Sequence, residues 1–579
     1  MNAMPEQSES LGDSQTVLSD AIERAEREQF VPRIWAKDAA LWKSTETQQK
    51  IINNSLGWLT VPRYTTERID EMETFVREVG AAGFTHLMLL GMGGSSLCPE
   101  VFRRTFGKRE GFPELLVLDT TDPDTINDFE SRIDLTRTLF IVSSKSGSTI
   151  EPLSFYKYFF DRVQSIKGEQ AGGNFIAITD PGTLMERIAR AANFRRVFLN
   201  PADIGGRYSA LSYFGMLPAA LMGCDVREIL KRTLRAMELS EASAPAEANN
   251  ALRLGCAVAG LAQKGQAKLT LVTSPQISSL GLWIEQLVAE STGKEGKGVI
   301  PIAVEPLGPP DVYGADRVFM AITVGHLEGE AEDRLRDLEA AGHPVIRRVL
   351  QEPLDLGAEF FVWEFATAVA GALLEINPFD QPNVQESKDN TNSLLEEFKQ
   401  NGKLPEQELS ALGDGLQIYG AKKQAATTAE IIGEHLSTVK AGDYIALLAY
   451  IQETAEHDEL LQAIRIRLRD RFHVATTSGY GPRFLHSTGQ LHKGGPDSGV
   501  FIQLTCDAQT DLAIPGEPYT FGILRQAQAL GDFSSLVKHG RRAIRIHLGR
   551  DVKAGLKKLL GIMTDDESLS AEYADQTIQ

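Results

Sequence analysis

Short apolar runs alternate with helical patterns between residues 68 and 390, and this alternation limits the folds open to the chain. In the first unit, helical patterns begin at or near Arg68, Pro99, Pro123 and Ile150. The apolar runs beside them are His86–Gly93, Leu115–Asp119, Thr138–Val142 and Asn174–Thr179. Short strands that alternate with helices predict an α/β protein with a doubly wound parallel sheet.

A second unit with the same alternation begins near Lys268. Its predicted elements are strand 268–274, helix 277–291, strands 318–324 and 344–349, and the apolar helix 360–374. After a polar stretch, alternation resumes in a third section, which either forms a layer of its own or completes the second sheet. We therefore divide the chain into a helical N-terminal arm, two α/β domains and a C-terminal α/β section, at residues 1–67, 68–240, 241–390 and 391–579. Disorder is expected for the opening residues, and a frayed acidic tail for the end.

The balance of charges bears on the partners of the chain. Lysine and arginine number 59 against 78 aspartates and glutamates, a formal net charge of -19, which argues against nucleic acid or an anionic membrane as a general partner. The cysteines lack the spacing of a zinc or redox motif and are expected to be reduced core thiols: Cys98, Cys224, Cys256 and Cys506. No signal peptide and no apolar run of transmembrane length is expected, which indicates a cytoplasmic protein.

The segment SSKSGSTIEP, residues 143–152, follows directly on an apolar run and is rich in hydroxyl side chains. A strand that ends in such a turn and opens a helix can hold a phosphate, because backbone N–H groups and the helix N-terminus both favour a negative charge there. The hydroxyls that could converge are those of Ser144, Ser146, Ser148 and Thr149. The alternative is an ordinary solvated turn.

Two glycine-containing turns are further candidates for ligand contact. GMGGSS, residues 91–96, follows a predicted strand, and its glycines would let a ligand approach the backbone closely. It is not a full dinucleotide fingerprint, since Ser96 takes the third glycine position, and it could also be a turn needed only for packing. In GGRYSALS, residues 205–212, Arg207 could bind a carboxylate structurally or stabilise an oxyanion.

The segment EQLVAESTGKEGKG, residues 285–298, places Gln286 and Glu290 on one helix face at i, i+4 spacing. A carboxylate that faces an apolar pocket is a candidate general base, whereas Glu295 fits a solvated loop charge better. In INPFDQPNVQESK, Lys388 lies beyond a helix that is nearly free of charge. A lone lysine of this kind is usually a surface residue.

Two histidines lie in the glycine-rich segment FLHSTGQLHKGGP, residues 484–496. His486 and His492 are six residues apart, and only Asp497 offers a nearby carboxylate, so the segment makes a poor metal site. Proton transfer or substrate contact suits these side chains better.

These strings together resemble successive signatures of the glucose-6-phosphate isomerase family. The strings are GMGGSSL, SSKSGSTIEP, GGRYS, QLVAESTGKEGKG and NPFDQPNVQESK, in this order, and the similarity runs from about residue 30 to 390. Including GYGPRFLHSTGQLHKGGP, the whole chain is most similar to the isomerase portion of bifunctional transaldolase/glucose-6-phosphate isomerases. The resemblance implies two sugar isomerase domains with flavodoxin-like αβα layers. No transaldolase domain is expected, because too few residues precede the first sheet for a (β/α)₈ barrel.

The resemblance also implies a role for each candidate side chain. The sugar phosphate would be held by Ser144, Ser146, Ser148, Thr149 and the backbone of Lys145, with Gly94 and Ser95 along the path of the sugar. Glu290 would move a proton between C2 and C1, Arg207 would stabilise the enediolate, and Gln286 would orient the substrate or Glu290. Lys388 and a histidine would assist opening of the sugar ring. No metal or organic cofactor is expected.

The chain departs from the family pattern at this histidine. In most members it lies between the glutamate and the lysine and comes from the neighbouring subunit, which implies a homodimer with shared active sites. Here that interval holds His326 and His343, neither in a similar motif. HSTGQLHKGG does resemble the family's histidine loop, which favours His486 over His492. The third section is therefore expected to contribute to the active site and to extend the second sheet.

The resemblance implies interconversion of glucose 6-phosphate and fructose 6-phosphate, with other functions open. One is an isomerase that also accepts mannose 6-phosphate, or that keeps transaldolase activity at an unrecognised site. Another is a sugar-phosphate-binding regulator without catalysis. The presence of Glu290, Arg207 and Lys388 argues against such a regulator.

Overall fold

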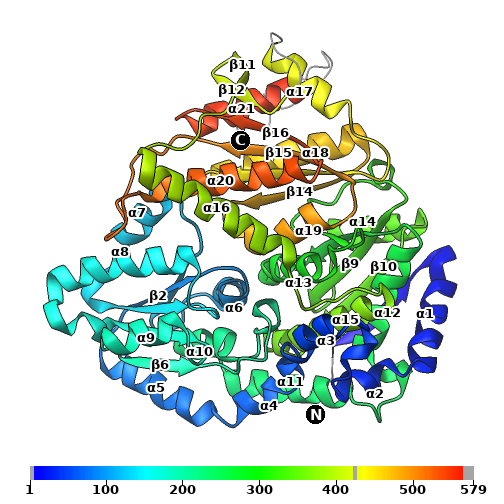
Figure 1. Ribbon diagram of the computed structural model, residues 1–579. Helices are drawn as coiled ribbons and strands as arrows, with labels where there is room; N and C mark the ends of the chain where they lie inside the picture. Colours follow the sequence, from blue (N-terminus) through cyan, green and yellow to red (C-terminus); the bar gives the residue numbers. More distant parts are fainter. Residues whose placement is uncertain (1–4, 422–426, 565–579) are drawn as a thin grey trace.

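Three β-sheets form the framework of the protein. The computed structural model describes residues 5–421 and 427–564. In Figure 1 the first sheet lies among the cyan and blue elements, the second among the green, and the third among the yellow to red elements. The predicted acidic tail after Thr564 lies outside the described residues. The α/β class and the parallel sheets predicted from the sequence are confirmed.

The first sheet is wholly parallel, in the order β3-β2-β4-β5-β6. Its strands are β2 (His86–Gly91), β3 (Glu114–Leu118), β4 (Thr138–Ser143), β5 (Phe175–Thr179) and β6 (Arg196–Leu199). Its helices are α5 (Ile69–Ala81), α6 (Leu97–Phe106), α7 (Pro123–Ser131), α8 (Ile150–Lys167) and α9 (Leu184–Ala191). The winding reverses beside β2, where Gly91 pairs in register with Ser143 at the carboxyl ends of the strands. Ligands bind at such a switch point.

The second sheet has the order β1-β10-β9-β7-β8 and is parallel except for β1 (Glu6–Ser10). Its parallel strands are β7 (Lys268–Thr273), β8 (Ile300–Ile302), β9 (Arg317–Val324) and β10 (Val345–Leu350). The helices around it are α12 (Asn250–Gln263), α13 (Leu280–Thr292), α14 (Glu330–Ala340) and α15 (Leu356–Leu373). Between the two sheets lie α10 (Tyr213–Leu221) and α11 (Val226–Glu238).

The N-terminal arm is not purely helical, and its first described residues are not disordered. Glu6–Ser10 forms β1, which pairs antiparallel with β10. The strand is polar, but Arg348 Nη1 donates to Gln7 Oε1 at 2.7 Å and Arg253 pairs with Glu9 at 2.7 Å. Pairing at the sheet edge and the contacts to these two arginines stabilise a strand that has no apolar pattern of its own. The helices of the arm are α1 (Gln15–Arg27), α2 (Phe30–Trp35), α3 (Glu46–Asn53) and α4 (Val61–Thr66).

One apolar segment is longer than the sequence analysis allowed. Pro353–Leu373, which contains α15, has the length and a mean hydropathy of 1.3 that a membrane-spanning helix would need, but its apolar window is completely buried in the fold. Helices of the arm and of both α/β domains surround it, with α11, α12 and α13 packed against α15. A core helix of a globular protein and a membrane-spanning helix share this composition because both are surrounded by apolar groups.

The C-terminal section forms a sheet of its own and does not extend the second sheet as predicted. The order is β11-β12-β16-β15-β13-β14. Its strands are β11 (Leu409–Gly413), β12 (Leu416–Tyr419), β13 (Tyr444–Tyr450), β14 (Ala475–Tyr480), β15 (Gly499–Thr505) and β16 (Arg542–His547). Its helices are α16 (Pro382–Asn401), α17 (Thr428–Leu436), α18 (Ala455–Phe472), α19 (Gly489–Gly494), α20 (Phe521–Lys538) and α21 (Val552–Thr564). The predicted boundary at residue 391 falls inside α16.

Buried side chains lie between β8 of the second sheet and β14 of the third sheet, where hydrogen bonds between the strands would have joined the two sheets. Arg465 Nη2 donates to the carbonyl of Ala303, just after β8, at 3.1 Å and to that of Thr476 in β14 at 2.7 Å. Glu305 Oε1 accepts from the Thr476 N–H at 3.1 Å. These bonds satisfy backbone groups that strand pairing would otherwise take, so the two sheets meet edge to edge through side chains.

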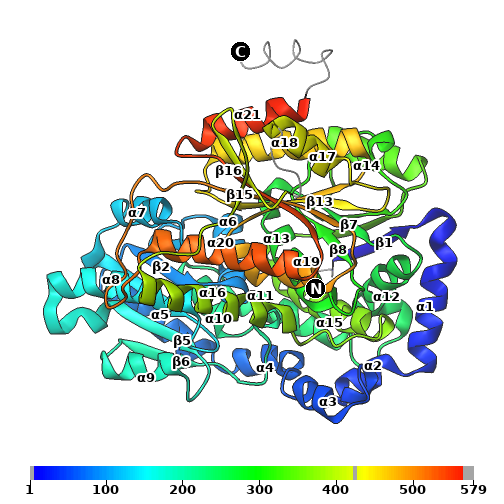
Figure 2. The ribbon, with the colours of Figure 1, turned by 45° about the horizontal axis from the view of Figure 1, so that its top comes forward.

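The C-terminal section also covers the first domain. Phe521 of α20 stacks on Phe155 of α8 at 6.0 Å between ring centroids, within a shared apolar core. Arg525 pairs with Asp122 at the start of α7, and both side chains are buried. Figure 2 shows α16 and α20 running together across the middle of the molecule. The carboxyl edge of the first sheet is thereby enclosed between two parts of the chain.

Candidate active site

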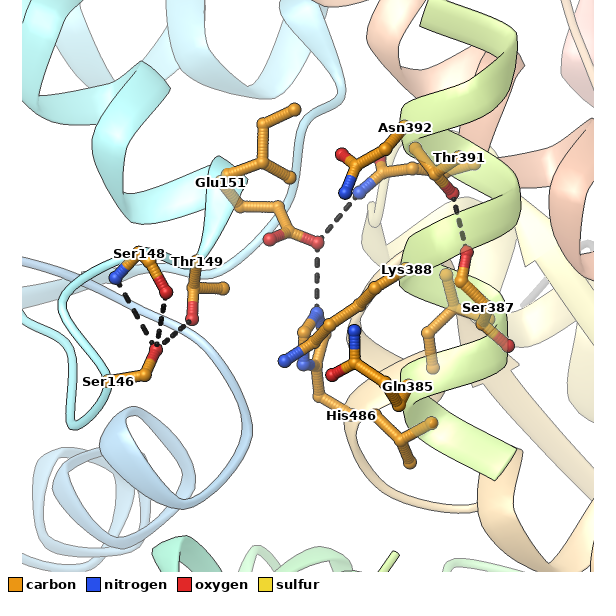
Figure 3. A pocket seen from close by; sticks show the side chains of 14 residues that line it. Ser146, Ser148, Thr149, Glu151, Gln385, Ser387, Lys388, Thr391, Asn392 and His486 are labelled. Carbon is orange, nitrogen blue, oxygen red and sulfur yellow. Dashed lines mark hydrogen bonds and ion pairs between the residues drawn. The ribbon is translucent and has the colours of Figure 1, made fainter. Parts of the chain in front are cut away.

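Two adjoining cavities lie where the first domain, the second domain and the C-terminal section meet. The larger has a volume of 230 Å³ (Figure 3) and the smaller 160 Å³. Both are lined by Ser146, Thr149, Val384, Lys388 and His486. The smaller cavity adds glycines 93 and 94 and the side chains of Arg207, Gln286 and Glu290. Every residue that the sequence analysis selected for the site lines at least one of the two cavities.

The hydroxyl-rich loop connects β4 to the N-terminus of α8. Ser146 Oγ lies 3.3 Å from Thr149 Oγ1 and accepts from Ser148 Oγ at 3.3 Å, so the three hydroxyls face a common space (Figure 3). The hydroxyl of Ser144 is buried and has no hydrogen-bond partner among the described residues. The ammonium group of Lys145 binds Asp180 and the carbonyl of Ala202 instead, so this residue can offer the cavity only its backbone.

The glycines after β2 bring two turns of the first domain into contact. A Cβ on Gly94 would lie 2.0 Å from the carbonyl oxygen of Gly206, which is the residue before Arg207. Only glycine permits this approach. The close contact places the turn after β2 and the arginine turn on the same wall of the smaller cavity.

Gly94→Ala is expected to lower the free energy of unfolding by about 2–3 kcal/mol, because the clashing neighbour is backbone and cannot rotate away. Gly206→Ala is the matched control, since a Cβ there meets no atom within 4 Å. Urea unfolding of both variants measures the difference. Equal midpoints for the two variants would contradict the steric argument.

The guanidinium group of Arg207 is held on every side. Its Nε donates to Ser291 Oγ at 2.7 Å, and Nη2 donates to the carbonyls of Pro378 at 2.7 Å and Asp380 at 3.0 Å. Nη1 lies 3.4 Å from Glu290 Oε1. The side chain is only 2% exposed, and these contacts hold its positive guanidinium group in one orientation at the edge of the cavity.

Glu290 and Gln286 lie one turn apart on α13 and face the smaller cavity. Gln286 Nε2 donates to Glu290 Oε2 at 3.3 Å and to the carbonyl of His486 at 2.6 Å. The carboxylate of Glu290 therefore has an amide on one oxygen and a guanidinium near the other. Because the same amide binds the backbone of the histidine loop, α13 and the C-terminal section are fixed relative to each other.

Glu285, the neighbour of Gln286, points away from the cavities and is 7% exposed. Burial raises its pKa from the ordinary 4.5 to about 8, against the opposing effect of Arg465. The unfolded chain therefore loses this proton first, and the carboxyl group makes the free energy of unfolding fall as the pH rises from about 4.5 to about 8.

Glu285→Gln is expected to remove this dependence, because the amide stays neutral. Between pH 5 and pH 8 the variant should gain about 1–3 kcal/mol of unfolding free energy relative to the parent. Urea unfolding at the two pH values measures the gain. A parallel pH dependence in both proteins would show that Glu285 does not titrate as stated.

The histidine loop reaches the cavities from the C-terminal section. His486 Nε2 lies 2.9 Å from Glu151 Oε1, at the start of α8, and Lys388 of α16 points toward the same space (Figure 3). Burial alone would raise the pKa of Glu151, but the neighbouring His486 and Lys388 hold it below its ordinary value. A carboxylate, an imidazole and an ammonium group thus share one corner of the site.

Comparisons with known proteins identify the family of the chain. A family model described as phosphoglucose isomerase matches residues 58–300. A glucose-6-phosphate isomerase of Rubrobacter xylanophilus is 30% identical over 390 residues, covering 58% of this chain and 88% of that protein. The chain belongs to the phosphoglucose isomerase family.

Two solved structures extend the comparison. The hypothetical protein TT0462 of Thermus thermophilus has a TM-score of 0.56 and 26% identity, over 67% of this chain and 99% of its own. A glucose-6-phosphate isomerase of Chlamydia trachomatis shares the fold with a TM-score of 0.56 at 19% identity, over 68% of this chain and 88% of its own. The model for the phosphoglucose isomerase family ends at residue 300, so Lys388 and the histidine loop lie beyond the segment that it matches.

In this member of the phosphoglucose isomerase family, the two candidate histidines have different surroundings. His492 is 3% exposed and packs among Tyr444, Phe484 and Phe501, with burial lowering its pKa well below the ordinary value. It does not line either cavity, and neither does His326 or His343. His486 is the histidine that the fold brings to the site.

His486 belongs to the same chain as the other residues that line the two cavities. Its loop is anchored by Arg483, whose Nε and Nη2 donate to the two oxygens of Asp119 at 2.9 and 2.8 Å. Asp119 directly follows β3 of the first domain and is buried. The loop is therefore attached to its own first domain by a bidentate ion pair.

Sequence reasoning missed two residues that line the larger cavity, Glu151 and Gln528, and a buried lysine near Arg207, Lys294. Glu151 lies within the segment 143–152 and no role was predicted for it, although its position just after the hydroxyl side chains was a usable signal. Gln528 lies on α20, far along the chain, and no motif marks it. Lys294 is buried and donates to Asn377 O at 2.6 Å, and burial and then Arg207 lower its pKa to about 7. No group of His, Cys, Asp and Glu suited to a metal ion occurs within residues 5–421 and 427–564.

Proposed function

We propose that the protein interconverts glucose 6-phosphate and fructose 6-phosphate through a cis-enediolate, with Glu290 as the base. The observation that carries this proposal is the placement of the Glu290 carboxylate beside the fixed Arg207 guanidinium, at 3.4 Å, in a cavity that continues to the hydroxyl-rich loop. A proton next to a carbonyl is weakly acidic, so its removal needs a positioned base and a positive group for the oxygen that gains charge.

The phosphate end of the substrate would bind the loop from Ser144 to Thr149, at the N-terminus of α8. Its hydroxyls and N–H groups suit a dianion, and binding far from the reacting carbons positions C1 and C2. Glu290 would take the proton from C2 and return it to C1. Arg207 would stabilise the enediolate oxygen, and Gln286 would keep the carboxylate of Glu290 in place.

Ring opening would take place at the other end of the sugar, where His486 and Lys388 lie. With Nε2 bound to Glu151, the other ring nitrogen of His486 remains for the substrate. We assign Glu151 as the residue that orients this imidazole, a role that carboxylates commonly have toward catalytic histidines.

We also propose that the protein is a cytoplasmic homodimer and that it takes part in glycolysis and gluconeogenesis. Nucleic acids and membranes are not among its proposed partners. We propose in addition that catalysis does not require a second subunit, because His486 and Glu290 reach the site from one chain.

The test is a coupled assay of the purified full chain with fructose 6-phosphate, mannose 6-phosphate and unphosphorylated glucose. Fructose 6-phosphate is expected to react fastest and glucose poorly, since glucose lacks the group that the loop binds. Turnover of mannose 6-phosphate would indicate a broader isomerase. Binding of sugar phosphates without turnover would support the regulator instead.

A further inference from the structure

Behind His486, a line of buried polar side chains alternates between the first domain and the C-terminal section. Thr121 follows β3, Gln528 lies on α20 and Glu151 begins α8. We propose that Thr121 and Gln528 act as positioning residues that fix the Glu151 carboxylate and, through it, the ring of His486. The inference deepens the proposed isomerase function and rests on it.

The contacts form one continuous path. Thr121 Oγ1 donates to Gln528 Oε1 at 2.7 Å, and Gln528 Nε2 donates to Glu151 Oε1 at 2.7 Å. His486 Nε2 lies 2.9 Å from the same Glu151 oxygen. Thr121, Gln528 and Glu151 are 0%, 2% and 3% exposed, so water does not replace these bonds easily.

The direction of each bond follows from the chemistry of the groups. An ionised carboxylate only accepts, so Gln528 must turn its NH₂ toward Glu151 and its carbonyl oxygen toward Thr121. The threonine hydroxyl then donates to that oxygen and opposes rotation of the amide. A rotated amide would place its oxygen against the carboxylate and would leave two buried acceptors facing each other.

The path has a consequence for the histidine. One oxygen of Glu151 takes hydrogen bonds from both Gln528 and His486, so the amide limits how far that oxygen can move. His486 then carries its proton on Nε2, and Nδ1 stays an acceptor. Without the amide, the carboxylate can turn, and the two tautomers of the ring become closer in energy.

The packing of α20 against the first domain does not depend on Gln528. One turn away, Arg525 pairs with buried Asp122, and its Nη2 donates to the carbonyl of Cys506 at 2.9 Å. Phe521 packs on Phe155 at the start of the helix. Substitution of the Gln528 side chain should therefore change the orientation of Glu151 without detaching the helix.

The experiment is a double-mutant cycle of Gln528→Met and Thr121→Val, with kcat and KM measured for fructose 6-phosphate. Each single variant is expected to lower kcat about tenfold with KM changed less than about twofold, and the double variant should be no slower than Gln528→Met alone. Thr121→Ser, which restores the hydroxyl, should recover most of kcat.

Gln503→Met is the matched control. Gln503 is equally buried in the same section and donates to Ala529 O at 3.0 Å, but it does not touch Glu151. It should keep the parental kcat. Additive losses in the cycle, or an equal loss in Gln503→Met, would overturn the proposal, because both indicate a general effect on packing.

A second measurement does not depend on turnover. Nitrogen-15 NMR of histidine-labelled protein reports the tautomer of His486, whose signals are assigned with the His486→Gln variant. The parent should show a single tautomer with the proton on Nε2, and Gln528→Met a mixture. An unchanged tautomer would overturn the proposal. If the parent had no isomerase activity, the proposed function would fail, and the NMR result would still decide whether the path positions the ring.

Discussion

Replacing Glu290 by glutamine is expected to lower kcat for fructose 6-phosphate by about 10³-fold, because the amide cannot accept the proton of C2. The change keeps the shape and the hydrogen bond from Gln286, so substrate binding should change little. A steady-state assay gives kcat and KM. A direct test of proton removal follows the exchange of the C2 proton of glucose 6-phosphate with deuterated water, which should slow by the same factor.

Glu285→Gln is the matched control for this variant. It makes the same chemical change five residues earlier on the same buried helix, at a carboxyl group that does not line the cavities. The parental kcat is expected. Near-parental turnover of Glu290→Gln would refute the assignment of the base, and a large loss in both variants would place the effect in the stability of α13.

The second prediction concerns two inactive chains produced together. When a Glu290→Gln chain and a His486→Gln chain are co-expressed and purified as a mixture, no activity is expected beyond the sum of the two separate variants. Each chain carries one defect in its own site, because His486 and Glu290 lie in one cavity of one chain.

A site shared between subunits would behave differently. Random pairing would give mixed dimers with one intact site each, and the mixture would regain about a quarter of the parental activity. That recovery would show that the histidine comes from the partner. His492→Phe serves as the control for His486→Gln, which should lose about 10²-fold in kcat, because the aromatic side chain fits among Tyr444, Phe484 and Phe501 and leaves the site unchanged.

The hydrophobic pattern of the sequence was sufficient to predict the strands of the first sheet that are buried on both faces. β2, β3, β4 and β5 are continuous apolar runs and were all predicted. The missed strands are polar or short. β1 consists of Glu-Gln-Ser-Glu-Ser, and β8 has three residues, so each is stabilised by its neighbours in the sheet and not by its own pattern.

The third sheet shows a different limit of the sequence. The hydrophobic pattern indicated some of its strands. Whether these strands join the second sheet depends on Arg465 and Glu305, whose side chains bind backbone groups 161 to 171 residues away. No local pattern contains this information. Motifs, in contrast, marked residues that line the same two cavities, because a loop suited to an anion needs its hydroxyls and glycines close together in the sequence. Gln528 acts across 377 residues and left no such mark.

Because α20 covers α8, the packing of α8 can be completed only after α20 has been synthesised on the ribosome. Glu151 leaves the exit tunnel 377 residues before Gln528, which at ordinary translation rates is about 20–75 s. During this interval the first domain can form its sheet, but Phe155 lacks Phe521 and Asp122 lacks Arg525. The growing chain therefore exposes an apolar helix face that a chaperone can bind, and Glu151 gains its hydrogen bonds from His486 and Gln528 only after both residues have been synthesised.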